Sequence, residues 1–170
     1  MSRLSYEDSC RRLESQQLVP PGEIPRQPPQ PGEGVAGVRF ANVMLAGAKL
    51  AGLTLPRTIF SRSEIRATTF RDAGLTESTA HWNDFIEVDF SRADLSGSDL
   101  RACVFQRVNF RDARLAGVDL RYYGFQHCDL TGADLTEAKL TPKAGQALRL
   151  SPEQQGVIDW QADDGEEPEG

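Results

Sequence analysis

Candidate catalytic and metal-binding groups are few in this chain of 170 residues, and they are scattered along it. The two histidines, His81 and His127, are far apart, and neither has the second histidine that a ligand set would need. The three cysteines, Cys10, Cys103 and Cys128, form no CxxC pair. No phosphate-binding loop or nucleophile motif is present. We therefore expect no catalytic site, no metal, no cofactor and no enzyme activity.

Aspartates recur at regular intervals and are the charged groups whose spacing stands out. They form rows of carboxylates, which either face a binding partner or satisfy the backbone at the corners of a repeat. Arg92, Arg111 and Arg114 interrupt these rows. The carboxylates that we treat as partner-binding candidates are Asp89, Asp94, Asp99, Asp119, Asp129 and Asp134.

The aspartates belong to a repeat of five residues. A large apolar residue stands at every multiple of five from Phe40 to Leu140 except at Ala80, and all eight phenylalanines fall in this register. A small residue stands two positions earlier, and a polar residue often lies between them. A period of five fits neither a helix nor a simple strand, but it fits a three-residue strand followed by a two-residue corner. Glycines suited to such corners are Gly47, Gly52, Gly97, Gly117 and Gly132.

Four such units complete one turn of the chain. Separations of twenty are the most frequent among the phenylalanines, and like residues stack best when a coil has this length. One column under this arrangement is leucine throughout: Leu55, Leu75, Leu95, Leu115 and Leu135.

Three segments, 93–97, 98–102 and 133–137, resemble the A(D/N)LXX unit of pentapeptide-repeat proteins. The resemblance extends over about 21 consecutive units without a break in register. It implies an all-β fold, a right-handed quadrilateral β-helix of about five coils, with short helical segments at both ends. The early units depart from the pattern at Arg39, Met44, Lys49, Ile59 and Glu64.

One corner of the expected coil gathers aromatic and basic residues. Trp82 and Tyr122 fall in the same corner column, and Arg101 and Arg121 run beside it. Exposed Trp and Tyr flanked by Arg resemble an interaction hot spot. The alternative is that Trp82 folds back to shield the thin core at Ala80.

The chain divides into four segments by composition. Residues 1–19 predict a short helix that begins near Ser5, and residues 20–34 a Pro-rich linker. Together they are either a cap over the first coil or an arm that binds a partner. Residues 35–140 form the repeat. Residues 141–170 predict a C-terminal cap, with a helix starting at Ser151 and an acidic tail, 163–167, that we expect to be disordered.

The C-terminal segment supplies apolar residues that cover the last coil or join two copies of the chain. In the family that the repeat resembles, C-terminal elements often make dimer contacts. The candidates for either role are Leu148, Leu150 and Trp160.

Charge and hydropathy exclude several functions. Residues 35–140 carry 13 basic and 13 acidic residues, so direct nucleic-acid binding is disfavoured. No apolar stretch is long enough to span a membrane, and no amphipathic basic helix is long enough to bind one. The start of the sequence has no apolar signal region, and we expect a cytoplasmic protein.

Three functional hypotheses follow, and none of them involves catalysis. Some members of the family that the repeat resembles imitate duplex DNA, bind DNA gyrase and protect this topoisomerase from poisons, which gives antibiotic resistance. The first hypothesis is a DNA mimic of this type, in which the carboxylate rows take the place of phosphates. The second is a scaffold or adaptor that binds an unrelated protein through the Trp82 corner. A purely structural module without a partner of its own is a third alternative.

Overall fold

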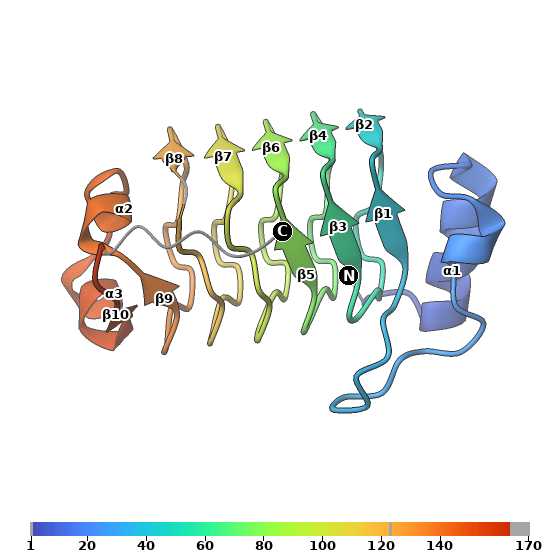
Figure 1. Ribbon diagram of the computed structural model, residues 1–170, viewed down its shortest axis with the longest axis horizontal. Coiled ribbons are helices and arrows are strands. Elements are labelled where there is room, and N and C mark those ends of the chain that lie inside the picture. Colours follow the sequence, from blue (N-terminus) through green and yellow to red (C-terminus); the bar gives the residue numbers. More distant parts are fainter. Residues whose placement is uncertain (1, 123, 164–170) are drawn as a thin grey trace.

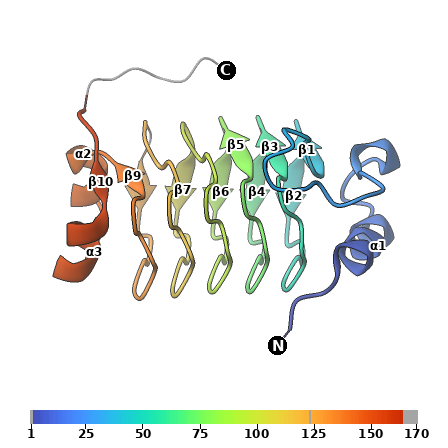
Figure 2. The same ribbon diagram turned by 90° about the horizontal axis from the view of Figure 1, so that it is seen from below.

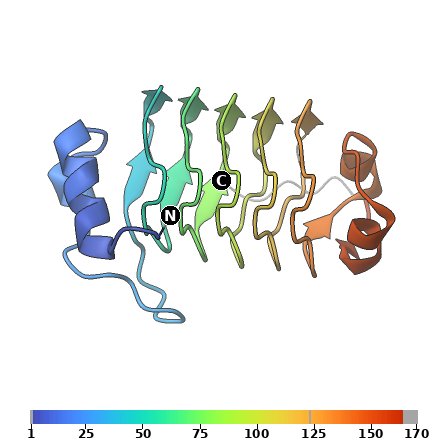
Figure 3. The same ribbon diagram turned by 180° about the vertical axis from the view of Figure 1, so that it is seen from behind.

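The computed structural model describes residues 2–122 and 124–163 as a rod of stacked coils with helices at both ends (Figure 1). The view from behind shows the same order along the rod (Figure 3). The elements are α1 (Tyr6–Gln16), the 3-10 helix η1 (Pro21–Glu23), β1 (Arg39–Ala41), β2 (Met44–Ala46), β3 (Ile59–Ser61), β4 (Glu64–Arg66), β5 (Thr79–His81), β6 (Asp84–Ile86), β7 (Val104–Gln106), β8 (Phe125–Gln126), β9 (Lys139–Leu140), α2 (Pro142–Gln146), α3 (Pro152–Val157) and β10 (Asp159–Trp160).

Every coil takes twenty residues and pairs in parallel with the next coil. One side of the rod stacks β1, β3 and β5, where Phe40 lies opposite Phe60. A second side stacks β2, β4, β6, β7 and β8, and the other two sides are joined by single bridges such as Thr69 to Asp89 and Asp94 to Arg114. The predicted right-handed, four-sided β-helix is confirmed, with five complete coils and a sixth that begins at β9.

Three-residue strands occur on fewer sides than the sequence predicts. The two sides that lack them still align residue by residue at the twenty-residue spacing, but each level contributes one bridged residue. The rod seen from below shows the strands on the same levels as these bridged segments (Figure 2). The five-residue period therefore fixes the path of the chain more strongly than it fixes continuous strand geometry.

Phenylalanine stacks fill the middle of the rod. Phe85, Phe105 and Phe125 stack face to face, with ring centroids 5.4 and 5.2 Å apart. Phe105 also meets Phe110 edge to face at 5.5 Å, and both rings are fully buried. Such offset and edge-to-face contacts stabilise aromatic pairs beyond the burial of their area. Because every coil is covered only by its neighbours, the two ends of the core need caps.

All corners of the coil place one residue in the left-handed region, at intervals of five from Asn42 to Glu137. Gly97 and Gly132 meet this demand without strain, with φ of 70° and 74°. Most corners hold other residues, such as Arg57 at φ 55°. The ladder of hydrogen bonds between coils therefore imposes a backbone conformation that side chains ordinarily disfavour.

Helix α1 covers the N-terminal end of the core, with Leu13 completely buried. Its polar groups also bond to the first coil. Ser9 Oγ accepts a hydrogen bond from the Thr54 amide at 2.8 Å, and Gln16 Nε2 donates to the Lys49 carbonyl at 3.2 Å. The helix thus satisfies backbone groups that no earlier coil is present to satisfy.

The Pro-rich segment after α1 packs against the molecule, whereas the sequence suggested an extended linker. It contains η1, and Ile24 and Pro29 are buried. The predicted helix start at Ser5 is confirmed, since its side chain accepts a hydrogen bond from the Asp8 amide. Tyr6 joins the two parts by donating its hydroxyl proton to the carbonyl of Pro25.

The C-terminal end is closed by α2, α3 and β10. Strand β10 pairs in parallel with β9 and extends the sheet by one strand. The side chain of Gln154 donates to the carbonyls of Leu130 and Ala133, at 2.8 and 3.0 Å. Ser151 and Gln154 form the capping box of α3, which confirms the predicted helix start. The acidic tail expected to be disordered lies outside the described residues, apart from Asp163 at its beginning.

Candidate protein-binding surface

The aromatic column predicted at one corner is present in the structure. Arg62, Trp82, Ala102 and Tyr122 occupy equivalent left-handed corner positions in four successive coils. The Trp82 amide donates to the Ala102 carbonyl at 3.2 Å, and the Ala102 amide donates to the Arg121 carbonyl at 3.1 Å. Trp82 and Tyr122 are half-buried, which lies between the exposed hot spot and the shielding arrangement that the sequence left open for Trp82, and Ala102 between them is buried. We call these four residues the aromatic corner.

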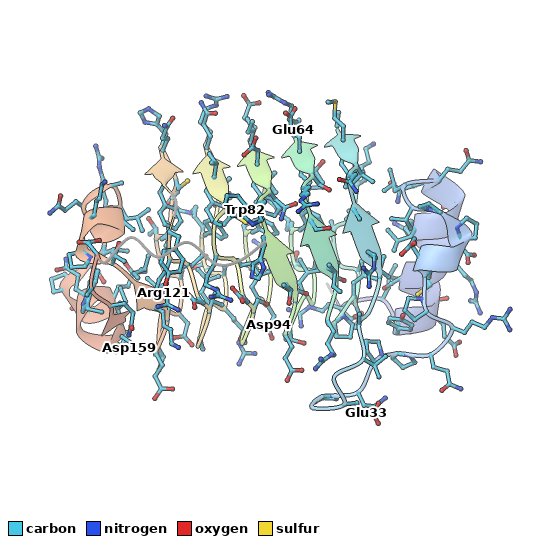
Figure 4. All side chains as sticks on the ribbon, in the orientation of Figure 1. Glu33, Glu64, Trp82, Asp94, Arg121 and Asp159 are labelled. Atoms are coloured by element: carbon cyan, nitrogen blue, oxygen red, sulfur yellow. The ribbon has the colours of Figure 1, made fainter. Side chains whose placement is uncertain are left out.

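A ladder of alternating charges runs beside the aromatic corner. Arg101 binds Asp99 through two hydrogen bonds of 2.8 Å, and Arg121 binds Asp119 in the same way at 2.9 and 2.8 Å. Arg101 Nε also lies 3.7 Å from Asp119, and His81 Nε2 lies 2.9 Å from Asp99. We call these five residues the charge ladder. Figure 4 labels Trp82 near the middle of the rod and Arg121 closer to the C-terminal helices.

The charge ladder holds its side chains in fixed positions. Asp119 and Arg121 expose only 15% and 20% of their side chains. The Arg121 guanidinium also lies 5.1 Å from the centre of the Tyr122 ring, a cation–π contact. Paired, partly desolvated arginines keep their orientation better than free surface arginines. The corner therefore presents a rigid surface.

The charge ladder lowers the pKa of Asp99. Burial alone would raise it, but the hydrogen bonds from Arg101 and His81 outweigh burial, and the net pKa is below its ordinary value. The hydrogen bond to Asp99 in turn raises the pKa of Arg101. Both shifts favour the charged forms and keep the pair intact at neutral pH.

Acid is expected to weaken the fold through Asp99. Because its pKa is depressed in the folded state, its contribution to stability is present above its unfolded pKa of about 3.9 and is lost as the pH falls through the folded value. Urea unfolding between pH 7 and pH 2.5 should show a smaller acid loss in Asp99→Asn than in the wild type. Asparagine keeps the turn, since Asn109 Oδ1 accepts the Arg111 amide in an equivalent unit. Equal acid losses in the two proteins would contradict the assignment.

The candidate carboxylates all accept hydrogen bonds from backbone amides. Each accepts, through one oxygen, a hydrogen bond from the amide two residues later, as Asp94 does from Ser96 at 3.0 Å. This is the local turn that Asx side chains favour. The residues that share this bond are Asp89, Asp94, Asp99, Asp119, Asp129 and Asp134.

Arginines also neutralise most of these carboxylates. Beyond the two pairs of the charge ladder, Arg111 lies 3.1 Å from Asp129 and Arg71 lies 3.5 Å from Asp89. Arg114 is 3.9 Å from Asp94, and it lies on the same face as Asp134, whose pKa is lowered mainly by hydrogen bonds from Thr136. The carboxylate rows are therefore rows of paired charges.

The cysteines and histidines form no reactive cluster. Burial raises the pKa of the Cys103 thiol to about 12, and burial also raises the pKa values of Cys128 and Cys10. These thiols stay protonated at neutral pH and so make poor nucleophiles. Within the described residues there is no group of three or more His, Cys, Asp or Glu placed to hold a metal ion. Nor does any helix of the described ranges have the length and apolarity to cross a membrane.

The three C-terminal candidates lie in different surroundings. Leu148 is buried in the core cluster, so it belongs to the cap. Leu150 is partly buried against the same core, and Trp160 remains 40% exposed while donating from Nε1 to the Gln155 carbonyl. Of the three candidates, Leu150 and Trp160 are thus the two that keep apolar surface, and Val157 of α3 is exposed at the same end of the rod.

Sequence reasoning missed the contacts that two side chains make, although it placed His81 beside the aromatic corner. His81 pairs with Asp99. The two residues are one coil less two residues apart in the sequence, so the twenty-residue period could have predicted that they lie close together. Asn83 stands at one of the small inward positions of the repeat. Its side chain is buried, accepts from the Ser63 amide and donates to the Phe60 carbonyl, so it is an internal structural bridge.

Comparison with known families agrees with the repeat. A family model described as pentapeptide repeats matches residues 84–121 and 125–141, in eight copies. A search among curated proteins finds no match.

Several solved structures resemble the chain. HetL, a pentapeptide-repeat protein involved in heterocyst differentiation regulation in the cyanobacterium Nostoc sp. strain PCC 7120, is 23% identical with a TM-score of 0.50. The match covers 59% of this chain and 48% of HetL, so the chain matches about half the length of that protein. This likeness shows the fold alone.

Two further structures are less similar in shape. A pentapeptide-repeat protein of the Arabidopsis thaliana thylakoid lumen is 27% identical over 74% of this chain and 84% of its own, with a TM-score of 0.45. QnrB1, a plasmid-mediated fluoroquinolone resistance protein, is 16% identical over 76% of this chain and 85% of its own, with a TM-score of 0.39. At these TM-scores neither likeness carries an argument about function.

Proposed function

Since this chain belongs to the pentapeptide-repeat family, whose repeats match between residues 84 and 141, we propose that it is a non-catalytic, cytoplasmic rod that binds a protein partner. The partner docks on the aromatic corner and on the charge ladder beside it. The protein acts as an adaptor, with the stacked coils as a rigid support. A homodimer through Leu150 and Trp160 stays a prediction alongside this proposal.

The observation that carries the proposal is the position of Trp82 and Tyr122 two coils apart on one corner, with Arg101 and Arg121 held beside them. Trp, Tyr and Arg are the residues that most often dominate binding energy at protein interfaces. Because these side chains are already ordered in the free protein, docking costs little further conformational entropy. The neighbouring ion pairs supply polar specificity at the rim of the contact.

Removing the indole should abolish partner binding while leaving the fold intact. Trp82→Asn suits the left-handed corner, since Asn tolerates φ near the observed 61°. We expect this variant to lose, in a quantitative pull-down, a protein that the wild type retains, with a loss of affinity of at least about tenfold.

A matched control lies on the diagonally opposite corner, where Asp112 is exposed at φ 56°. Asp112→Asn should retain the same protein, and circular dichroism should show wild-type folding for both variants. If Trp82→Asn retains the protein as well as Asp112→Asn does, the aromatic corner is not the docking surface.

Protection of DNA gyrase or another topoisomerase by DNA mimicry is the second candidate function. The favouring observation is that Asp94 and Asp134 occupy equivalent places on one face, with Arg114 between them. Against it, arginines lie within 4.0 Å of the other candidate carboxylates, which weakens any likeness to a phosphate row. We therefore rank this function below the adaptor role.

A charge variant tests the mimic directly. If the carboxylate row imitates phosphates, Arg114→Gln completes it and should protect gyrase at severalfold lower protein concentration than the wild type. The assay is drug-stabilised DNA cleavage with a gyrase poison. Arg107→Gln, which removes a charge paired with Glu87 on another corner, is the matched control. If neither the wild type nor Arg114→Gln reduces cleavage over a wide concentration range, the mimic is excluded.

A further inference from the structure

The N-terminal end of the rod leaves one strand edge open. In every inner coil, outward-pointing residues bond to the coil before them, as the Glu64 amide does to the Val43 carbonyl at 3.0 Å and the Arg66 carbonyl does to the Gly47 amide at 3.0 Å. The equivalent groups of the first coil are the Met44 amide and the Ala46 carbonyl. They point away from the rod, because the first coil has none before it, and no described residue bonds to them.

The cap covers only part of this end. Helix α1 supplies Ser9 and Gln16 to the first-coil backbone at Thr54 and Lys49, on the two sides of the coil without strands. Strand β2 is the terminal strand of its five-stranded sheet, and Figure 1 shows it as the last of the upper row. Met44 is 73% exposed, and Ala46 is exposed as well. An edge strand of this kind is a template for pairing with another extended chain.

The charged residues of the first coil itself are all basic. Residues 34–63 contain four basic residues and no acidic residue, although the later coils are rich in aspartate. Arg39 and Lys49, both exposed, stand on either side of β2 along the coil. Arg39 also attracts a carboxylate in this structure, since Glu23 of η1 lies 3.6 Å from its Nε. The edge is therefore complementary to an extended segment with acidic ends.

We propose that the outer edge of β2 binds an extended acidic peptide segment of a partner protein by strand addition. The segment accepts a hydrogen bond from the Met44 amide and donates one to the Ala46 carbonyl. An apolar side chain next to its centre lies along Met44, and its flanking carboxylates face Arg39 and Lys49. Backbone bonds supply affinity and the two charges supply selectivity, as in other modes of strand addition. This site is separate from the aromatic corner and uses different residues.

Fluorescence anisotropy of a labelled heptapeptide, with three central valines between pairs of glutamates, tests the proposal. The full-length protein should bind this peptide, and a version with N-methylated valines should bind at least about tenfold more weakly because its amides cannot pair. A version with lysines in place of the glutamates should lose binding to a similar extent. Trp82→Asn should bind the peptide as the wild type does, which separates this site from the adaptor surface.

Met44→Pro removes the outward amide, which bonds to no described residue of the free protein. An edge strand tolerates proline at such a position. The variant should weaken binding at least about tenfold, whereas Met44→Ala, which keeps the amide, should retain most of it. The proposal is overturned if the wild type fails to bind the peptide, if the N-methylated peptide binds equally well, or if Met44→Pro binds unchanged. The N-methylated peptide decides the question on wild-type protein even if Met44→Pro does not fold.

Discussion

Replacing Phe105 with alanine is expected to lower the free energy of unfolding by about 3–5 kcal/mol. The ring is fully buried and contacts three others, with centroids 5.4 Å from Phe85, 5.5 Å from Phe110 and 5.2 Å from Phe125. Loss of the ring leaves a cavity in the middle of the rod. The neighbouring coils cannot fill this cavity without breaking the backbone hydrogen bonds that join them. Urea unfolding followed by circular dichroism measures the change.

Phe105→Leu is the matched variant, because leucine keeps most of the volume but none of the ring contacts. We expect it to cost roughly 1.5 kcal/mol, as volume-conserving core changes do. Similar costs for the two variants would mean that the phenylalanine stack is not the main source of core stability.

Replacing Leu13 with alanine should lower the free energy of unfolding by about 2–5 kcal/mol. Leu13 of α1 is completely buried, and it belongs to the same core cluster as Phe40 and Leu50 of the first coil. Loss of this contact loosens the cap and exposes the apolar end of the solenoid. The same unfolding experiment measures the effect, and static light scattering should show the loosened variant associating.

Arg12→Ala is the control for the cap, since Arg12 lies next to Leu13 on α1 and is exposed. A surface change of this kind should stay within about 0.5 kcal/mol of the wild type. If Leu13→Ala is equally mild, residues 1–19 act as an independent arm and not as a cap.

The sequence was sufficient to predict the path of the chain because the inward positions repeat without interruption. Phe60, Phe85 and Phe105 all stand at multiples of five. A coil of any length other than twenty residues would stack phenylalanine on phenylalanine less often in neighbouring coils. The corner conformation was predicted only at glycines. At Arg57 and Asp72 the positive φ is imposed by hydrogen bonds to the next coil. The conformational preference of the residue itself does not predict such bonds.

The candidate site was predicted less completely than the fold. The period placed Trp82 and Tyr122 in one column, but it could not show that they would be half-buried, since this depends on how side chains lean across neighbouring coils. The role of the aspartates depended on partners elsewhere in the chain. Asp99 binds both Arg101 and His81, and only the stacked geometry shows that its charge is already used.

The central claim is that the aromatic corner contacts a protein partner, and site-specific photo-crosslinking tests it most directly. A benzophenone amino acid would replace Arg62, the exposed residue of that corner, or Asp112 on the opposite corner, in cells of the source organism. We expect position 62 to give a discrete crosslinked protein that Trp82→Asn abolishes, and position 112 to give none. No adduct at position 62, or the same adduct from position 112, would contradict the account.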